Sequence, residues 1–225
     1  MPTIHSARER IAGWRPVDQL LRRRASAVMA KTGIGRYLTG SQTILDLGSG
    51  TGHIAAALMR ASAHSRLILV DPIWRPTKRV MQRLDANERS EWTYLKAQAQ
   101  DLPIGSNSID LVLAAFVLHH VAWPDQVHIL AEVRRILKPG GRLVLIEDTP
   151  RTDAEECRTL LADRILNAET TPAVHNYRTA AEWMLRLSEA EFGLESKTQF
   201  TGIPPRVVYM PVPHCCFVSK KFHAR

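Results

Sequence analysis

The sequence has few cysteines, few aromatic residues and no long apolar run. Its longest uninterrupted apolar segment is LVLAAFVL at 111–118, far shorter than the roughly 20 residues of a bilayer-spanning helix. The first residues lack the apolar core of a secretory signal. The three cysteines include the adjacent pair Cys215 and Cys216, and they form neither a disulfide framework nor a CxxC motif. We therefore expect a reduced, cytoplasmic protein.

Signatures of metal binding are absent as well. The sequence has no HExxH motif, no zinc-ligand spacing and no obvious acidic cluster for magnesium. No internal repeat or low-complexity segment interrupts it. A chain of 225 residues has the size of one α/β domain with a substantial core. We expect a single domain over residues 1–225, with no metal.

Positive charge is concentrated near the beginning of the chain. The formal net charge is +8, and residues 1–40 contain eight basic residues against two acidic ones. Such a patch suits nucleic acid, an anionic membrane surface or an acidic substrate. The same segment carries an apolar stripe at helical spacing, formed by Val17, Leu20, Leu21, Ala25 and Val28. We interpret it as an amphipathic helix with a solvated basic face.

After this segment, apolar runs alternate with amphipathic stretches, which is typical of βαβ units and a parallel sheet. The expected strands are 43–47, 66–70, 92–95, 109–115 and 142–147. The expected helices are about 51–61, 75–88 and 125–138, the last ending at a Lys-Pro-Gly-Gly turn.

The C-terminal part is expected to add helices and then strands. Residues 151–190 form a helical insertion, in which Thr179 and Glu182 make a capping box for the second helix and Gly193 ends it. The stretches LESKTQF and HCCFVSKK follow and predict a hairpin-like pair of strands.

A glycine-rich turn follows the first expected strand, in the stretch ILDLGSGTG. Gly48, Gly50 and Gly52 carry no Cβ and tolerate positive φ, so the main chain can approach a ligand closely. The dinucleotide pattern Gly-x-Gly-x-x-Gly is not met, because His53 stands where its third glycine would be. The turn therefore favours a ligand without a pyrophosphate.

Two acids accompany this turn. Asp71 ends the second expected strand, 19 residues after Gly52, a spacing at which a carboxylate can take both hydroxyls of a ribose. Asp46 precedes the first glycine by two residues, and a carboxylate there suits a ligand with an ammonium group. Taken alone, the glycine turn leaves a nucleotide-binding or purely structural turn as the alternative interpretation.

Four stretches in order resemble the class I S-adenosylmethionine (SAM) dependent methyltransferases, of the small-molecule, UbiE-like type. They are LDLGSGTG (45–52), LVDP (69–72), AQDLPIGSNSIDLVLAAFVLHHV (99–121) and LKPGGRLVLIED (137–148). The resemblance implies an α/β fold with a Rossmann-like sheet, mostly parallel with an antiparallel C-terminal hairpin strand, and helices on both faces. It divides the chain into a basic helical cap (1–40), a SAM-binding core (41–148), a helical substrate-lid insertion (149–192) and C-terminal strands (193–225).

The resemblance also implies SAM as the cofactor and S-adenosylhomocysteine as its product. The glycine turn would line the methionine part of SAM, Asp46 would anchor its amino group, Asp71 would take the ribose, and the stretch at 100–102 would border the adenine. The implied cofactor-binding residues are Asp46, Gly48, Ser49, Gly50, Thr51, Gly52, Asp71, Pro72, Gln100, Asp101, Leu102, Ala115 and Phe116.

Two histidines follow the fourth expected strand, where parallel sheets open their ligand crevice. The sequence is similar to sugar O-methyltransferases in pairing histidines here with an acid at the end of the fifth strand. This similarity implies His119, His120 and Glu147 as catalytic residues, with Asp148 as the alternative acid. We take His120 as the candidate general base, with Glu147 holding its ring, because His119 directly follows the apolar run and is expected to pack inward.

The loop between the two helices of the insertion carries polar side chains. His175, Asn176 and Tyr177, together with Asp148, are the candidate acceptor-binding residues. An ordinary polar surface loop is the alternative interpretation of this stretch.

Methyl transfer from a sulfonium requires alignment of the acceptor and, for a hydroxyl, removal of its proton. We predict a metal-independent O-methyltransferase of a small-molecule acceptor. The first alternative is a quinone or isoprenoid C-methyltransferase, held at an anionic membrane by the basic helix. Nucleic-acid or protein methylation and a non-catalytic SAM-binding module are the others. Nucleic acid is disfavoured because no Asn/Asp-Pro-Pro-Tyr sequence and no RNA-binding module is present.

Overall fold

A computed structural model describes residues 14–62, 64–73, 76–89, 91–167, 175–202 and 212–222. Within them, seven strands form one sheet in the order β3-β2-β1-β4-β5-β7-β6. The strands are β1 (Thr43–Leu47), β2 (Arg66–Val70), β3 (Glu91–Leu95), β4 (Ile109–Ala115), β5 (Leu137–Asp148), β6 (Phe192–Phe200) and β7 (His214–Lys221). The first five run parallel, whereas β7 is antiparallel to both of its neighbours. The expected fold class is confirmed.

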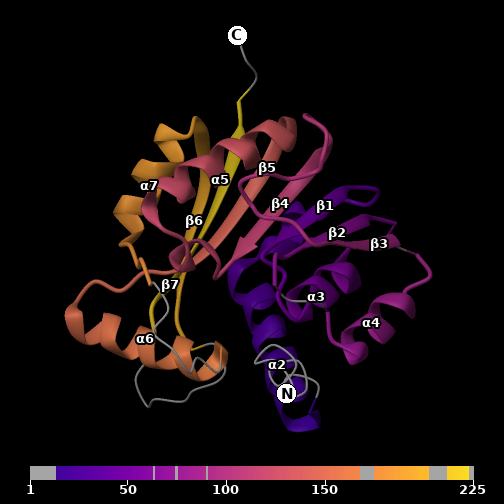
Figure 1. The fold of residues 1–225 in the computed structure, drawn as a ribbon, viewed down its shortest axis with the longest axis horizontal. Coiled ribbons are helices and arrows are strands. Elements are labelled where there is room, and N and C mark those ends of the chain that lie inside the picture. The colour runs from indigo at the N-terminus through magenta and orange to yellow at the C-terminus, as the bar shows by residue number, and fades with distance from the viewer. Residues whose placement is uncertain are drawn as a thin grey trace.

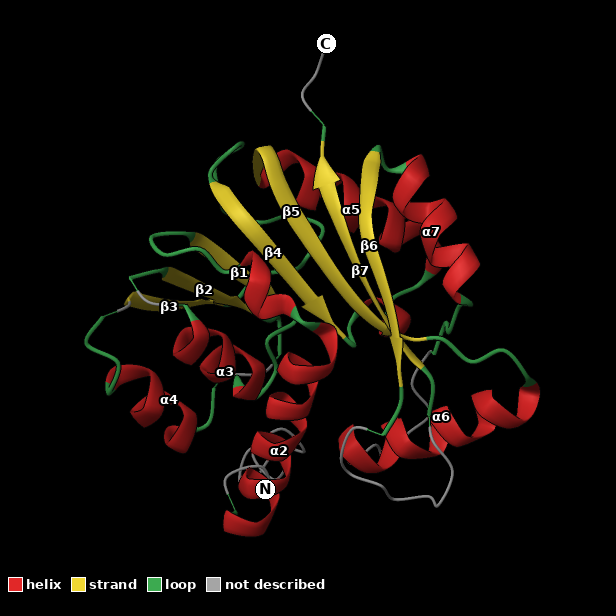
Figure 2. Ribbon diagram, turned by 180° about the vertical axis from the view of Figure 1, so that it is seen from behind, coloured by secondary structure: helices red, strands yellow, loops and turns green. Residues whose placement is uncertain are grey.

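Helices cover both faces of the sheet (Figures 1 and 2). The described helices are α2 (Arg15–Thr32), α3 (His53–Ala61), α4 (Lys78–Asp85), α5 (Trp123–Ile136), α6 (Asp153–Asn167) and α7 (Ala180–Glu189), with short 3-10 turns η1 (Ile34–Tyr37) and η2 (Leu118–His120). One apolar core joins α5 and α7 to the sheet, and a second joins α2, α3 and α4 to the opposite face. None of the helices in the described ranges is long and apolar enough to cross a bilayer.

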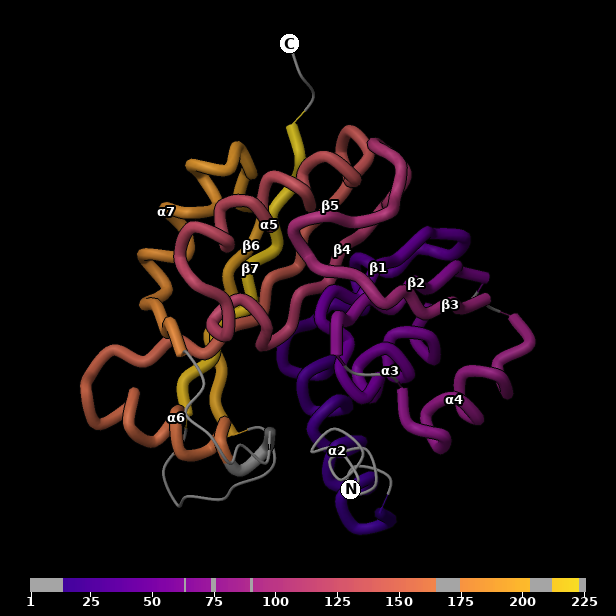
Figure 3. Tube along the Cα trace, in the orientation of Figure 1, coloured from indigo at the N-terminus to yellow at the C-terminus, as the bar shows by residue number. Residues whose placement is uncertain are grey.

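The chain order of the strands fixes where a ligand site can form. From β1 the chain moves outward to β2 and β3, then returns to place β4 on the other side of β1. The connections after β1 and β4 therefore diverge, and they leave a crevice at the carboxyl ends of the strands. Helices α2 and α6 lie beyond this edge of the sheet, apart from each other (Figures 1 and 3).

Helix α2 is fixed to the domain by buried polar contacts as well as by its apolar stripe. Asp18 is 4% exposed, accepts a hydrogen bond from Nε2 of His53 at 3.1 Å and pairs with Arg83 on α4. The helix ends at Gly33, which adopts a left-handed conformation with φ 62°. Because Ala25 and Val28 are buried while Arg22 and Arg23 are exposed, α2 is amphipathic, as the sequence predicts.

Most expected elements are present, with two differences. β5 is longer than expected because residues 138–141 remain part of the strand, with an irregularity in the pairing to β4 between Ile109 and Leu111. Gly193 does not cap a helix: α7 ends at Ala190, and Gly193 lies in β6, paired with Lys220. The capping box at the start of α7 is confirmed, and so is the antiparallel pairing of β6 with β7.

Candidate functional site

The turn after β1 is held by backbone hydrogen bonds to the end of β2. The amide of Ser49 donates to the carbonyl of Val70 at 3.0 Å, and that of Gly52 donates to the carbonyl of Ser49 at 2.8 Å. The amide of Gly50 donates to the carboxylate of Asp71 at 3.0 Å. The turn and the acid after β2, which the sequence links only by spacing, are therefore in contact.

The three glycines of the turn serve different purposes. All have positive φ, at 67°, 52° and 80° in chain order. A Cβ on Gly48 would lie 2.5 Å from a methyl carbon of Val117, and one on Gly52 would lie 3.0 Å from Val80. A Cβ on Gly50 would meet nothing closer than the carbonyl of Gly48, at 4.0 Å. Packing thus requires two of the glycines, and at Gly50 the backbone faces open space that a ligand can approach.

Asp46 is a buried acid with spare hydrogen-bonding capacity. Its side chain lies at the carboxyl end of β1 and is 2% exposed. Burial, with the nearby charge of Asp71, raises the pKa of Asp46 to about 8. Among the described residues, Oδ2 of Asp46 and the hydroxyl of Ser49 have no hydrogen-bond partner. Since a buried polar atom without a partner is costly, this pair fits a ligand that brings hydrogen-bond donors, an ammonium group above all.

Asp71 anchors the loop that it begins. One carboxylate oxygen accepts from Gly50 and the other from the amide of Ile73 at 2.9 Å. Its own carbonyl accepts from the hydroxyl of Tyr94 at 3.0 Å. Pro72 follows at the surface of this loop. Carboxylate oxygens can each accept more than one hydrogen bond, so the contacts with the turn leave the ribose role open to Asp71.

Thr51, within the glycine turn, and residues 100–102, which lie apart from it in sequence, are further candidate cofactor residues. The side chain of Thr51 bonds to Nδ1 of His53 at 2.9 Å. Leu102 is buried in the α5 side of the core, and its amide donates to Glu132 at 2.8 Å, whereas its neighbours Gln100 and Asp101 are more exposed. The side chain of Leu102 is therefore occupied by core packing.

Ala115 and Phe116 end β4 at the crevice. Phe116 has a φ of 58°, a conformation that is strained for a bulky residue and is often retained at functional sites. The guanidinium of Arg24, from α2, lies 4.5 Å from the centre of the Phe116 ring. The ring of His214 meets Phe116 edge-on at 5.6 Å. The ring of Phe116 thus contacts both Arg24 and His214, and the next residue, Val117, packs on Gly48 of the glycine turn.

Glu147 organises the turn that follows β4. The side chain is fully buried. Its Oε1 accepts from the amides of Val117 and Leu118 at 3.2 and 2.7 Å, and its Oε2 accepts from Nδ1 of His119 at 2.5 Å. The sequence-based expectation that Glu147 holds the ring of His120 is therefore wrong, because the buried ring next to it is that of His119.

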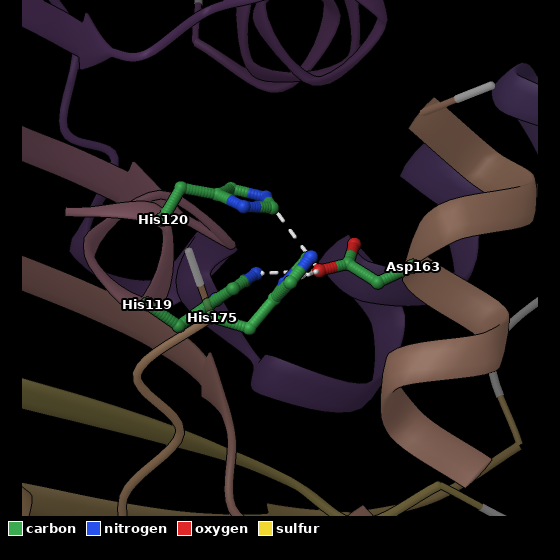
Figure 4. Close-up of side chains that lie close together, drawn as sticks. All are labelled: His119, His120, Asp163 and His175. Carbon is green, nitrogen blue, oxygen red and sulfur yellow. Dashed lines mark hydrogen bonds and ion pairs between the residues drawn. The ribbon is translucent and has the colours of Figure 1, made fainter. Parts of the chain in front are cut away.

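Three histidine side chains point toward one carboxylate oxygen of Asp163 (Figure 4). Asp163 lies on α6, and its Oδ2 is 2.9 Å from Nε2 of His119, 3.6 Å from Nε2 of His120 and 3.3 Å from Nδ1 of His175. The hydroxyl of Tyr177 donates to the same oxygen at 3.2 Å. We call His119, His120, Asp163, His175 and Tyr177 the histidine cluster.

The two adjacent histidines have pKa values that are shifted in opposite directions. Burial opposes the protonation of His119, but Glu147 and Asp163 outweigh it and raise its pKa well above the ordinary value. Burial and the neighbouring His119 lower the pKa of His120 to about 4. Burial would raise the pKa of Asp163, but the hydrogen bond from His119 and the nearby charges lower it to about 2. These shifts favour the protonated form of His119, which lies between two carboxylates, and the neutral form of His120.

The other candidate acceptor residues differ in what they contact. The amide of Asn176 donates to the carbonyl of His119 at 2.6 Å, and its side-chain amide donates to the carbonyl of Val121 at 2.9 Å. Asn176 thus fastens its segment to η2. Asp148 accepts from Nδ1 of His214 on β7, and its charge also acts on His120.

Two residues of the site were missed by sequence reasoning. Asp163 is one of several polar residues on an amphipathic helix, and Arg24 is the third of three consecutive arginines. Burial lowers the pKa of Arg24, while Asp148 and Asp163 oppose this change. Arg24 thus differs from Arg22 and Arg23, which are exposed. Only its position one turn before the buried Val28 could have distinguished it.

Comparison with known proteins identifies the domain. The family described as "Methyltransferase domain" matches residues 45–145. Residues 45–145 form a class I methyltransferase domain. The sequence-based assignment to this class is confirmed.

Curated relatives extend the match only over part of their own length. The uncharacterized protein YafE of Escherichia coli is 32% identical over 49% of this chain and 51% of its own length. The ubiquinone/menaquinone biosynthesis C-methyltransferase UbiE of Desulfotalea psychrophila is 34% identical over 49% of this chain and 43% of its own length. The chain thus spans about half of the curated relatives that it matches.

Solved structures share the fold over most of the chain. A SAM-dependent methyltransferase of Methanosarcina mazei is 19% identical, with a TM-score of 0.64 over 85% of this chain and 97% of its own. The 1,6-didemethyltoxoflavin-N1-methyltransferase of Burkholderia thailandensis, solved with its acceptor and S-adenosylhomocysteine, is 17% identical, with a TM-score of 0.63 over 91% of this chain and 79% of its own. At these identities the likeness concerns the fold of the methyltransferase domain.

Proposed function

We propose that this protein transfers the methyl group of SAM to a small-molecule acceptor, and that the accepting atom is an oxygen. The observation that carries the proposal is the contact between the two halves of the crevice. Gly48 of the glycine turn packs on Val117 with no room for a Cβ, and Val117 lies two residues before His119. A cofactor on the glycine turn would therefore present its methyl group beside the histidine cluster.

The residues proposed to hold SAM are those of the glycine turn with Asp46 and Asp71. SAM, when bound, supplies a methyl group that is already activated on a sulfonium. Oδ2 of Asp46 and the hydroxyl of Ser49, which have no partners among the described residues, offer acceptors for its amino group. The open backbone at Gly50 gives room for the ligand, and Asp71 is placed to accept from ribose hydroxyls.

The acceptor is proposed to lie between η2, α6 and the segment at 175–177. His120 is the proposed general base for an acceptor hydroxyl. It is neutral, and 30% of its side chain is exposed, whereas His119 is fully buried and bonded at both ring nitrogens. His119, Glu147 and Asn176 are proposed to position this part of the site through their mutual contacts.

Carbon methylation of a quinone is the second candidate. It is favoured by the similarity to UbiE proteins, of which that of Hahella chejuensis aligns over 72% of this chain and 66% of its own length at 28% identity. A carbon acceptor needs its proton removed after methyl transfer, so the same cluster could serve it. The basic face of α2, with Arg22 and Arg23 exposed, would suit an anionic membrane that holds such a substrate.

The decisive experiment identifies the product. The purified protein is incubated with SAM bearing a deuterated methyl group and an extract of host metabolites, and labelled products are isolated by mass spectrometry. Nuclear magnetic resonance of the labelled product then assigns the methyl group to oxygen or carbon. A His120→Ala protein is the matched control for background labelling. A C-methyl product would replace the first candidate by the second, and binding of SAM without any labelled product would contradict both.

A further inference from the structure

Three histidine nitrogens and one carboxylate oxygen converge at the carboxyl edge of the sheet (Figure 4). His119, His120, Asp163 and His175 each offer one ligand atom, and these four atoms all lie within 4.8 Å of one another. We propose that these four side chains bind a divalent transition-metal ion of the zinc class. The inference departs from the sequence-based expectation of a metal-independent enzyme, and it does not depend on the proposed methyl transfer.

The spacing of the ligand atoms suits four-coordinate binding. Bonds of about 2.0 to 2.2 Å place neighbouring ligands of a tetrahedral site about 3.3 to 3.6 Å apart. The distances from Oδ2 of Asp163 to the nitrogens of His119, His175 and His120 are 2.9, 3.3 and 3.6 Å. These values bracket the tetrahedral spacing, and the nitrogens lie within 4.8 Å of one another, so side-chain adjustments that draw the nitrogens together would place all four atoms around one ion.

The ring of His119 is oriented as a metal-binding imidazole would be. Its Nδ1 donates to Glu147, and its Nε2 points to Asp163. A carboxylate on the far nitrogen is the usual means of fixing the tautomer and orientation of a metal-bound histidine. Glu147 is itself held by two backbone amides, so the support of this ligand is in place before any ion binds.

The charges around the cluster leave room for a divalent cation. Glu147, Asp148 and Asp163 are all buried, and Arg24 interacts electrostatically with the last two. With neutral imidazoles, three carboxylates against one guanidinium leave an excess of two negative charges. Because uncompensated buried charge is expensive, a divalent ion in the place of the proton on Nε2 of His119 would be stabilised here.

The donor set determines the class of ion. Three imidazoles with one carboxylate suit zinc and its first-row neighbours, whereas magnesium and calcium take predominantly oxygen ligands. Such an ion would bind α6 and the segment at 175–177 to η2. His120 would then be a ligand through Nε2 and no longer the base, and an acceptor hydroxyl would bind the ion as an added fifth ligand, where the ion lowers the pKa of that hydroxyl.

The test measures metal binding without SAM and without acceptor, so its result is separate from that of the proposed function. Tag-free protein is stripped with a chelator and titrated with Zn²⁺ and with Co²⁺, while bound metal is measured by mass spectrometry and the cobalt spectrum is recorded. We expect one ion per chain, a visible cobalt spectrum typical of four-coordinate nitrogen and oxygen ligands, and loss of that spectrum on adding Zn²⁺. Excess Mg²⁺ should not displace the ion.

Variants assign the ion to the cluster. Asp163→Ala and His175→Ala should each abolish stoichiometric binding, and Glu147→Gln should keep one ion but weaken its affinity about 10- to 100-fold. His128→Ala, which removes an exposed histidine on α5, should bind like the wild type. Circular dichroism checks folding, and His175→Ala decides if Asp163→Ala fails to fold. Absence of saturable binding by the wild type, or wild-type binding by folded His175→Ala, would overturn the proposal and leave a purely hydrogen-bonded cluster.

Discussion

The crevice has two halves that are built in different ways. The cofactor half consists of the turns after β1 and β2, and its main residues lie between Asp46 and Asp71, held by short-range backbone contacts. The acceptor half draws side chains from η2, β5, α6 and the segment at 175–177, in which His119 and Tyr177 are 58 residues apart in sequence. The first half can be recognised as a motif. The second exists only once α6 and the segment at 175–177 have packed over the crevice, so the two halves should respond independently to substitution.

The largest expected effect is on the acceptor half. His120→Ala should lower turnover roughly 10²- to 10⁴-fold, the range for loss of acid–base assistance. This holds whether the imidazole accepts the proton itself or binds an ion that lowers the pKa of the acceptor hydroxyl. The affinity for S-adenosylhomocysteine should stay near that of the wild type. Single-turnover methylation and calorimetry measure the two quantities, with His128→Ala as the control histidine. A wild-type rate would make His120 a structural residue.

The next largest effect is a loss of cofactor affinity on substitution in the cofactor half. Asp71→Ala should cost on the order of 1.5 to 3 kcal/mol of binding free energy for S-adenosylhomocysteine through loss of charge-assisted hydrogen bonds, or roughly 10- to 150-fold in affinity. Calorimetry gives the dissociation constant, and thermal unfolding separates this loss from loosening of the glycine turn, which Asp71 also holds. Glu88→Ala, an exposed acid after α4, is the control. Unchanged affinity would remove Asp71 from the cofactor site.

What could be predicted from the sequence follows the same division. The limits of β1, β2 and β4 were predicted correctly, because each strand is a short apolar run bounded by polar or glycine residues. Asp110, in β4, accepts from the amide of Thr43 and from Lys138 and so joins neighbouring strands. These features depend on neighbours in sequence or on adjacent strands.

The missed features depend on packing between distant segments. Asp163 belongs to the site because the face of α6 that carries it points toward His119 in η2. Arg24 belongs to the site because α2 places its guanidinium over the ring of Phe116. Apart from the position of Arg24 one turn before Val28, nothing in the local sequence distinguishes either residue from exposed neighbours of the same type. The exchange of His119 for His120 as the partner of Glu147 has a similar cause, since it depends on the direction in which a short 3-10 turn presents two consecutive side chains.

Binding of SAM to the cofactor half should be coupled to release of a proton from Asp46. Burial and Asp71 raise the pKa of Asp46 to about 8, so its carboxyl is mostly protonated near neutral pH. A ligand ammonium stabilises the carboxylate, so binding of SAM should release up to one proton at neutral pH and progressively less as the pH rises through about 8. Calorimetry in buffers of different ionisation enthalpy counts the protons. Release that persists unchanged in Asp46→Asn would assign it to another group.

The raised pKa of Asp46 also predicts how the stability of the folded protein changes with pH. The folded-state pKa of Asp46 lies above its ordinary value of 3.8, so protonation stabilises the folded protein, and this contribution is lost as the pH rises from that value through about 8. Asp46→Asn should therefore gain stability relative to the wild type as the pH increases over this window. Chemical denaturation at several pH values measures the difference. A difference that is constant with pH would contradict the shifted pKa.

The smallest expected effect lies next to the acceptor half and tests whether the halves are separate. Thr179 caps α7 and follows the segment that carries His175 and Tyr177, and its hydroxyl accepts from the amide of Glu182 at 3.3 Å. Thr179→Ala should lower the free energy of unfolding by about 1 kcal/mol, the usual cost of losing an N-cap, as measured by urea denaturation against Ser188→Ala, an exposed hydroxyl on the same helix. Because the cofactor half is held by its own backbone contacts, the affinity for S-adenosylhomocysteine should not change. A parallel loss of that affinity would show that the cap is transmitted to the glycine turn, through the contact of Val117 with Gly48, and the two halves would then have to be treated as one cooperative unit.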